Sequence, residues 1–232
     1  MFIKEVSRVN NTILSTLQPE LIFSLIIMIA LGIFFVYVGK KVMAADPLSK
    51  PKGVVLVCET GVEMVYNYMK SIMPAKFEKN YYPYFAMLFV YLIVANLSGL
   101  IGFDAPTSNF SITLALTLIT FALIQWNSIK KKGGFNYFKE LVWPPTNILS
   151  VLSPLISLSM RLFGNILSGT ILMSLIYSFT GWLSGLIKIQ FNVFGPIIAP
   201  LFHAYFDIFS GCIQTLVFVT LSSILIAIEA ED

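Results

Sequence analysis

The feature that most constrains this chain is a set of five long apolar segments, each with the length that a helix needs to cross a bilayer. A transmembrane helix requires about 20 consecutive, mostly apolar residues. Inside lipid, such a segment satisfies its own backbone hydrogen bonds by forming a helix. The sequence therefore predicts an all-α integral membrane protein with five spans at about 21–39, 82–103, 109–129, 147–180 and 196–229.

The composition agrees with this prediction. Hydrophobic residues make up 57% of the chain and charged residues only 12%, whereas a soluble domain carries about 25% charged residues. We interpret residues 1–232 as a single membrane domain, because no internal repeat or long linker interrupts it. The last two predicted spans exceed one bilayer thickness, so they must tilt strongly or protrude.

Several function classes find no support in the sequence. The net charge of +3 is too small to indicate nucleic-acid binding, and P-loop, H-E-x-x-H and G-x-S-x-G patterns are absent. A single histidine cannot build a His-rich metal site. We therefore expect neither a cofactor nor a metal, and we interpret Cys58 and Cys212 as free thiols.

Lysine and arginine residues set the expected orientation, because they are enriched in cytoplasmic loops. With residues 1–20 placed outside, three loop cations lie outside and eleven lie inside. The three are Lys4, Arg8 and Lys188; the eleven are Lys40, Lys41, Lys50, Lys52, Lys70, Lys76, Lys79, Lys130, Lys131, Lys132 and Lys139. The sequence thus predicts an outer N-terminus and a cytoplasmic C-terminus.

One further segment, residues 54–73, reads as a helix that does not cross the membrane. Its sequence "VVLVCETGVEMVYNYMKSIM" contains two Glu, a Lys and an Asn among apolar residues at helical spacing. This pattern is typical of an amphipathic helix lying at the cytoplasmic interface.

The stretch "SLSMRLFGNILSG" places Arg161 within the fourth predicted span. Its guanidinium stays protonated, and a cation at mid-bilayer costs at least ~2.5–3.5 kcal/mol. Long apolar flanks on both sides disfavour snorkelling to the interface. We therefore expect a function for Arg161.

Four small or polar residues share the helix face of Arg161, because residues three or four apart lie together on a helix. They are Ser157, Gly164, Asn165 and Ser168. Small residues also let membrane helices approach closely. Packing and function therefore both remain open for Ser157, Gly164 and Ser168.

The fifth predicted span carries a second polar face, formed by His203, Asp207, Ser210 and Gln214 at helical spacing. Asp207 is the only carboxylate well inside a predicted span, so it needs a partner or water. It could form a static ion pair with Arg161. Alternatively, it could take up and release protons along a hydrated path, since an apolar site favours the neutral carboxyl. For His203, a helix-to-helix hydrogen bond and a functional role are both open.

Polar residues also mark the two ends of the third predicted span. Asn109 and Ser111 stand at its outer end, where helix capping accounts for them well. Gln125, Asn127 and Ser128 stand at its inner end, where they could line a cytoplasmic opening or lie at the interface. No nucleophile–base pair accompanies these groups, so ion translocation is the simplest interpretation, with two half-paths that a fixed cation keeps apart.

These motifs resemble a known family. "SLSMRLFGNILSG" closely resembles the arginine motif of subunit a of F-type ATP synthases, and "CIQTLVFVTLSSILIAIE" resembles the last helix of that subunit. "VANLSGLIGF", "PTSNFSITLAL" and "SIKKKGG" resemble its middle part. The similarity runs from the first span to the end of the chain.

The resemblance implies a stator subunit of a rotary motor with no catalytic site of its own. In that family, the two long tilted helices face a ring of c subunits that carry carboxylates, and the arginine separates two aqueous half-channels. The implied partners are the c ring, peripheral-stalk b subunits, other synthase subunits and membrane lipid, with no nucleic acid. The implied location is the bacterial plasma membrane.

The resemblance also assigns positions residue by residue. Arg161 takes the place of the family's arginine, Gln214 that of its glutamine and Asn165 that of an asparagine. Asn109 and Ser111 match outer-channel positions, and Ser128 matches an inner-channel serine.

At two positions the chain departs from many bacterial members. Thr170 and Asp207 stand where those members have a glutamate and a histidine. The acid has moved to the neighbouring helix, so the outer half-channel is expected to keep a carboxylate. Whether His203, one turn earlier, replaces the missing histidine stays open.

Two other classes of function compete with this one. A stand-alone secondary transporter or ion channel would use Asp207 and Arg161 as a charge-compensated site and would conduct without a ring, but the chain has no repeats. A structural membrane anchor would tolerate Arg161→Ala, although burying a cation for no purpose argues against it.

Overall fold

The computed structural model describes residues 18–44, 53–101, 105–144, 146–187 and 191–230. Within these ranges the elements are helical and no strand occurs. Five helices there are long and apolar enough to cross a membrane, which confirms the number of spans predicted. They are Pro19–Met43, Lys79–Ile101, Phe110–Lys132, Thr146–Leu186 and Phe194–Glu229.

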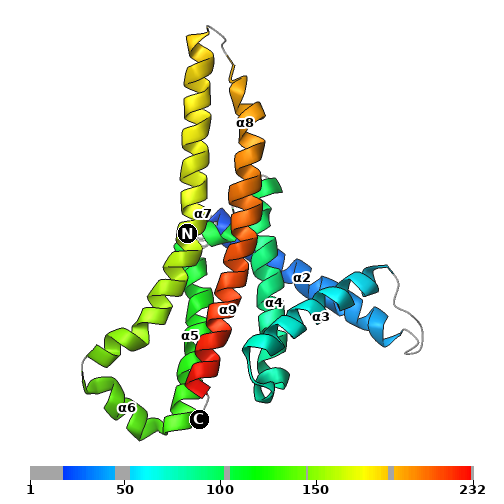
Figure 1. The fold of residues 1–232 in the computed structure, drawn as a ribbon. Coiled ribbons are helices and arrows are strands. Elements are labelled where there is room, and N and C mark those ends of the chain that lie inside the picture. The colour runs from blue at the N-terminus through cyan, green and yellow to red at the C-terminus, as the bar shows by residue number, and fades with distance from the viewer. Residues whose placement is uncertain (1–17, 45–52, 102–104, 145, 188–190, 231–232) are drawn as a thin grey trace, which may run out of the picture.

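The longer helices form the bundle shown in Figure 1, in which α9 lies between α4 and α5. In chain order they are α2 (Pro19–Met43), α3 (Val54–Ile72), α4 (Glu78–Leu97), α5 (Phe110–Lys132), α6 (Gly134–Val142), α7 (Thr146–Leu186), α8 (Phe194–His203) and α9 (Gly211–Ala230). Short 3-10 turns η1 (Ala75–Phe77), η2 (Ser98–Ile101) and η3 (Pro106–Ser108) flank α4, and a π-helical segment, η4 (Ala204–Ser210), joins α8 to α9.

Most predicted spans are shorter than the helices that form. α2 continues through Lys40 and Lys41, and α5 continues through Lys132. Cations in the last turn of a helix interact favourably with its dipole, so the helix extends past the apolar stretch. Gly133, with φ of 76°, then ends α5 and begins α6, because glycine adopts this conformation readily.

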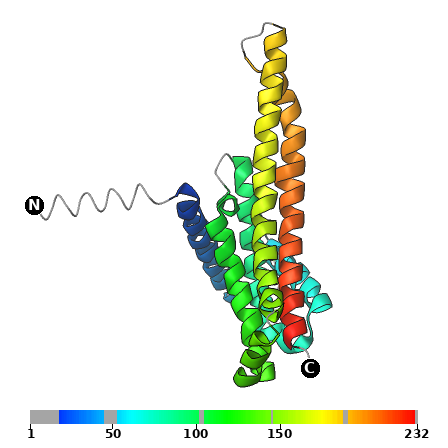
Figure 2. The same cartoon turned by 90° about the vertical axis from the view of Figure 1, so that its left-hand side faces the viewer.

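The longest helix, α7, rises with α8 beyond the other helices (Figures 1 and 2). Its 41 residues correspond to about 62 Å of helix at 1.5 Å per residue. The hydrocarbon core of a bilayer is about 30 Å thick. The helix is therefore longer than one bilayer thickness, while its tilt or protrusion stays a prediction.

The uniform spacing of polar residues predicts one regular helix for the fifth span, but the structure differs. The π-helical segment Ala204–Ser210 interrupts it, and π-turns widen the helix and rotate the faces of the residues that follow. His203 and Asp207 contact one another and Ser210 bonds to Asn165, while Gln214 lies beyond the π-segment. Asp207 lies in the π-segment and is half-buried, whereas Gln214, in α9, is buried.

A buried polar lock holds α4, η3 and α9 together. The Asn96 side-chain amide donates to the Gly211 carbonyl at 3.2 Å and to Thr215 Oγ1 at 3.1 Å. Thr107 Oγ1 donates to Asn96 Oδ1 at 2.9 Å. A Cβ on Gly211 would lie 3.2 Å from Asn96 Cβ, so glycine permits this close approach of α4 and α9.

Two helices lie outside the five candidate spans. α3 forms over the segment predicted as an amphipathic helix, while its location at the membrane interface stays a prediction. α6 was not predicted; it buries Tyr137 and leaves Phe135 and Phe138 exposed. Its nine residues are too few for a convincing period in the sequence.

Candidate functional site

Two polar cavities lie at different heights along α7. The upper cavity has a volume of about 310 Å³ and lies between α4, η3, α7 and the π-segment η4. The lower cavity has a volume of about 270 Å³ and lies between α5, α6, α7 and α9. The two cavities have no lining residue in common.

A carboxylate hydrogen-bonded to an imidazole marks the upper cavity. Asp207 Oδ2 lies 2.6 Å from His203 Nδ1, one turn away. The other imidazole nitrogen, Nε2, lies 3.1 Å from the Tyr177 hydroxyl of α7. Both Asp207 and His203 line the cavity. A carboxylate, an imidazole and a phenol in series can hand a proton along hydrogen bonds.

Amide and hydroxyl groups complete the polar lining of the upper cavity. Asn165 Oδ1 accepts a hydrogen bond from Ser210 Oγ at 2.6 Å, which ties α7 to η4. The amide nitrogen of Asn165 is buried and has no partner among the described residues. Ser108, Thr170 and Asn96 also line the cavity, so neutral polar groups surround the single carboxylate.

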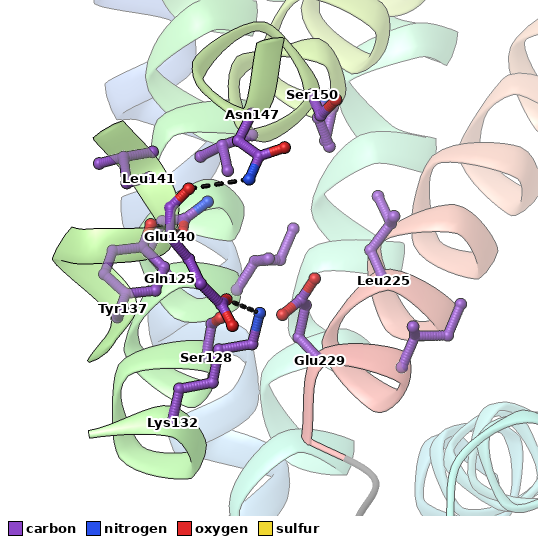
Figure 3. A pocket seen from close by; sticks show the side chains of 14 residues that line it. Gln125, Ser128, Lys132, Tyr137, Glu140, Leu141, Asn147, Ser150, Leu225 and Glu229 are labelled. Atoms are coloured by element: carbon purple, nitrogen blue, oxygen red, sulfur yellow. Dashed lines mark hydrogen bonds and ion pairs between the residues drawn. The ribbon is translucent and has the colours of Figure 1, made fainter. Parts of the chain in front are cut away.

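The lower cavity is more highly charged (Figure 3). Lys132 Nζ of α5 forms an ion pair with Glu140 Oε2 of α6 at 2.6 Å. Glu229 of α9 approaches the same cavity from the opposite side. The Asn147 amide donates to the Glu140 carbonyl at 2.8 Å, which connects α6 to the start of α7.

Tyr137 lies in the wall of the lower cavity and donates a hydrogen bond to Gln125 Oε1. Burial raises the pKa of Tyr137, because it disfavours the phenolate, and the Glu229 carboxylate raises that pKa further. Lys132 acts in the opposite direction. Tyr137 therefore stays protonated at neutral pH and serves as a hydrogen-bond donor.

Arg161 lies on α7 between the two cavities. The lower cavity reaches Pro154 on this helix and the upper cavity begins at Asn165. At 1.5 Å per residue, Arg161 lies about 10 Å from the first and about 6 Å from the second along the helix axis. Its side chain is exposed on the surface of this chain, and no ion pair joins it to a carboxylate in the part that the structure describes.

This geometry bears on the two alternatives for Asp207. Its ion-pair partner in the structure is His203, and nothing in the described ranges links it to Arg161. The static pair of Arg161 with Asp207 is therefore not formed. Ser157 and Ser168 are exposed on the same helix as Arg161, and Ser168 Oγ donates to the Asn165 carbonyl at 2.9 Å.

The other residues singled out in the sequence separate into different environments. Ser128 is buried in the wall of the lower cavity. Gln214 is buried, and its amide nitrogen has no partner among the described residues. Asn109 caps α5, accepting from the Ser111 backbone N–H at 2.9 Å, and also bonds to Gln18. Asn109 and Ser111 do not line the upper cavity.

Sequence reasoning missed several polar residues around the cavities. Asn96 and Tyr177 contact the upper cavity or its histidine, and Glu140 contributes an acid to the lower one. Asn96 was detectable as an amide inside an apolar span. Glu140 gave no signal, because it lies in a short polar stretch after the lysine run. Within the described ranges, no group of three or more His, Cys, Asp or Glu residues could hold a metal.

Comparisons with known proteins give a consistent result. A family model described as ATP synthase A chain matches residues 21–227. ATP synthase subunit a of Mycoplasma genitalium is 32% identical over 218 residues, covering 85% of this chain and 74% of that protein. ATP synthase subunit a 2 of Acaryochloris marina is 25% identical over 224 residues, covering 94% of this chain and 88% of that protein.

Proposed function

This chain belongs to the ATP synthase A chain family, and on that premise we propose how it passes ions as the membrane stator subunit of a rotary F-type ATP synthase. The two cavities are the inner ends of two aqueous half-channels, and Arg161 keeps them apart. Protons leave one half-channel, travel on carboxylates of a neighbouring rotor ring, and enter the other. The observation that carries this proposal is the placement of two separate polar cavities on either side of one exposed cation.

The upper cavity supplies the outer half-channel. Asp207 takes up a proton from the outer side and passes it towards the rotor, while His203 holds the carboxylate in place. Support comes from the 2.6 Å contact between the two side chains. A carboxylate that exchanges protons quickly needs contact with both water and a hydrogen-bond partner, and Asp207 is only partly buried.

The lower cavity supplies the inner half-channel. Glu140 and Glu229 line it together with Lys132. Two carboxylates and an ammonium at the end of the bundle keep this path hydrated. Protons that leave the rotor would meet an acidic opening on their way out, with Ser128 in its wall.

Arg161 acts as barrier and as partner. A fixed cation repels protons that would pass directly from one cavity to the other. The same cation attracts an ionised carboxylate on the rotor, and its exposed side chain can reach a neighbouring subunit. Since no described carboxylate of this chain pairs with it, the stator itself leaves this charge available to the rotor.

The proposal includes an orientation and a set of neighbours. The lower cavity faces the cytoplasm, as the lysines near the ends of α2, α4 and α5 indicate. The c ring lies against the exposed face of α7 that carries Arg161, and the peripheral-stalk b subunits contact the chain elsewhere. The membrane is a bacterial plasma membrane.

The transporter or channel alternative loses its main support in the structure. That alternative requires Arg161 and Asp207 to compensate one another within one chain. Asp207 instead pairs with His203.

Side-specific cysteine labelling tests the two half-channels. Thr170→Cys in the upper lining and Ser150→Cys in the lower lining form a matched pair, because both are exposed small polar residues of α7. Leu175→Cys, an exposed apolar position of the same helix, is the control. Cys58 and Cys212 are first replaced, and the assembled synthase is treated in oriented vesicles with a membrane-impermeant thiol reagent.

The expected result is labelling of position 170 only from the outside and of position 150 only from the cytoplasmic side. Labelling of both from one side would contradict two half-channels of opposite access. Equal labelling of Leu175→Cys would show that the reagent does not report on the cavities.

A further inference from the structure

We propose that the cleft between α3 and α4 is a binding site for the headgroup of an anionic phospholipid. α3 packs against the lower part of α4 (Figure 1). A cavity of about 530 Å³ lies between them. It has no lining residue in common with the upper or lower cavity, so this inference does not depend on the proton paths.

Two lysines form the polar rim of this cleft. Lys76 lies in η1 and Lys79 lies in the first turn of α4. These are the two cations of the described lining, and the Lys76 ammonium also lies 5.2 Å from the centroid of the Phe77 ring. Lys79 makes no ion pair within the described ranges. A phosphate group is the natural counter-charge, and basic pockets beside transmembrane helices bind anionic lipid headgroups.

The rest of the lining is apolar or aromatic. It consists of Val62, Tyr66, Tyr82, Pro83 and Ala86. Val62 and Tyr66 are four residues apart on α3, and Lys79, Pro83 and Ala86 follow one face of α4, as helical spacing requires. One end of the cleft is therefore cationic and the other end suits hydrocarbon.

The depth of the cleft distinguishes a lipid from a free anion. The candidate span of α4 begins at Lys79, which places the lysines at headgroup level. Ala86 lies seven residues further, about 10 Å along the helix and inside the apolar layer. A phospholipid fills both levels, with its phosphate at the lysines and the start of an acyl chain beside Ala86. A free phosphate would use the rim alone.

Aromatic contacts hold the walls of the cleft in place. The rings of Tyr66 and Tyr82 meet edge to face with centroids 5.4 Å apart, which joins α3 to α4. The Tyr82 hydroxyl donates to the Met73 carbonyl at 2.9 Å. The cleft is thus formed by the protein before a lipid enters, which lowers the ordering cost of binding.

Photolabelling of the intact synthase tests this site. The complex is reconstituted in phosphatidylcholine vesicles that contain a trace of either photoreactive phosphatidylglycerol or photoreactive phosphatidylcholine. The test variant is Lys76→Gln/Lys79→Gln. The matched control is Lys40→Gln/Lys41→Gln. It removes two neighbouring lysines at the end of α2, and neither of them lines the cleft.

The expected result is anionic-lipid labelling of residues 62–86 that falls roughly 25-fold in the test variant, at about fivefold per lysine, and changes less than twofold in the control. The zwitterionic probe should label the cleft weakly in all forms. Equal labelling by both probes, or an equal loss in both variants, would overturn the site.

Two further outcomes would replace the lipid by another ligand. Complete competition by millimolar inorganic phosphate would identify a site for a free anion. Cross-linking of Lys76 and Lys79 to another synthase subunit, in place of lipid, would identify the cleft as a protein contact. Either result contradicts the proposal.

Discussion

The upper and lower cavities are similar in volume and different in chemistry. The upper one, of about 310 Å³, contains one carboxylate, Asp207, which is bonded to His203 among neutral amides and hydroxyls. The lower one, of about 270 Å³, brings together Glu140, Glu229 and Lys132. The upper cavity lies beside a π-helical segment, whereas the lower cavity is lined on one side by Tyr137, Glu140 and Leu141 of the short helix α6 (Figure 3).

This difference implies that the two proton paths respond differently to the loss of one side chain. In its described lining, the upper path has a single carboxylate, Asp207, so proton uptake there depends on that group. A path with two carboxylates at the end of the bundle can lose one of them and still conduct. We therefore expect the upper cavity to be sensitive to single substitutions and the lower cavity to be tolerant of them.

The largest expected effect comes from Asp207→Asn. The amide keeps the shape of the side chain but cannot take up a proton, so ATP-driven acidification of vesicles should fall by at least about tenfold. Asp207→Glu should retain more activity, because it restores a carboxyl group. The amount of synthase in the membrane serves as the control for assembly. Normal pumping by the Asp207→Asn variant would show that Asp207 does not carry protons.

A smaller effect is expected in the lower cavity. Glu140→Gln and Glu229→Gln should each reduce pumping by about two- to fivefold, and the double variant should reduce it by more than the product of the two, because proton transfer then lacks both acids. The same acidification assay checks this. A single substitution as severe as Asp207→Asn would break the contrast between the cavities.

Stability should show the same asymmetry. Asn96→Leu removes three hydrogen bonds from the buried lock near the upper cavity, with an expected loss of about 1–3 kcal/mol. Asn127→Leu is the matched change near the lower end, where an amide that is only half-buried makes two hydrogen bonds with Tyr81 and one to the Leu123 carbonyl. It should cost under ~1 kcal/mol. Thermal dissociation of the purified complex measures both, and an equal shift would argue against a special role for the lock.

The smallest effect concerns Tyr137. Burial and then Glu229 raise the pKa of Tyr137 above its ordinary value, which is about 10. Its neutral form is thus favoured on folding. That stabilisation is fully present below pH ~10 and is lost as the pH rises through the raised pKa.

Tyr137→Phe should accordingly change pumping less than twofold, with no altered pH dependence between pH 6 and 9, where the phenol stays neutral. Ultraviolet titration of the tyrosines, compared between the two forms, measures the missing step. A step from Tyr137 near neutral pH would contradict the assigned environment.

Much of the fold could be predicted from the sequence. The lengths of the apolar segments predict the five spans, because a segment inside lipid must satisfy its own backbone hydrogen bonds and therefore forms a helix. The ends of the helices are less predictable, since charged residues such as Lys132 continue a helix beyond its apolar segment. The π-segment could not be predicted, since periodicity assumes one helix type throughout. The prediction that the polar residues from His203 to Gln214 share one face rests on that assumption.

The site was predictable only in part. Charges inside spans identified Arg161 and Asp207, because such charges are rare in lipid. The contact of Asp207 with His203 agrees with their i, i+4 spacing, whereas a pair between Asp207 and Arg161 depends on how two helices pack, which spacing along one helix does not give. For Asn109 and Ser111, the structure contains the helix-capping contact that the local sequence predicts. Their role in the outer half-channel, which the family resemblance implies, stays a prediction.

The central claim is that Arg161 separates two half-channels, and one experiment addresses it most directly. Passive proton conductance and ATP-driven acidification are compared in vesicles that contain the whole synthase with either wild-type chain or Arg161→Ala. The account predicts that acidification vanishes while the passive leak persists or rises, because the barrier is gone and protons no longer need the rotor. Unchanged acidification with an unchanged leak would contradict it and would give this charge another purpose.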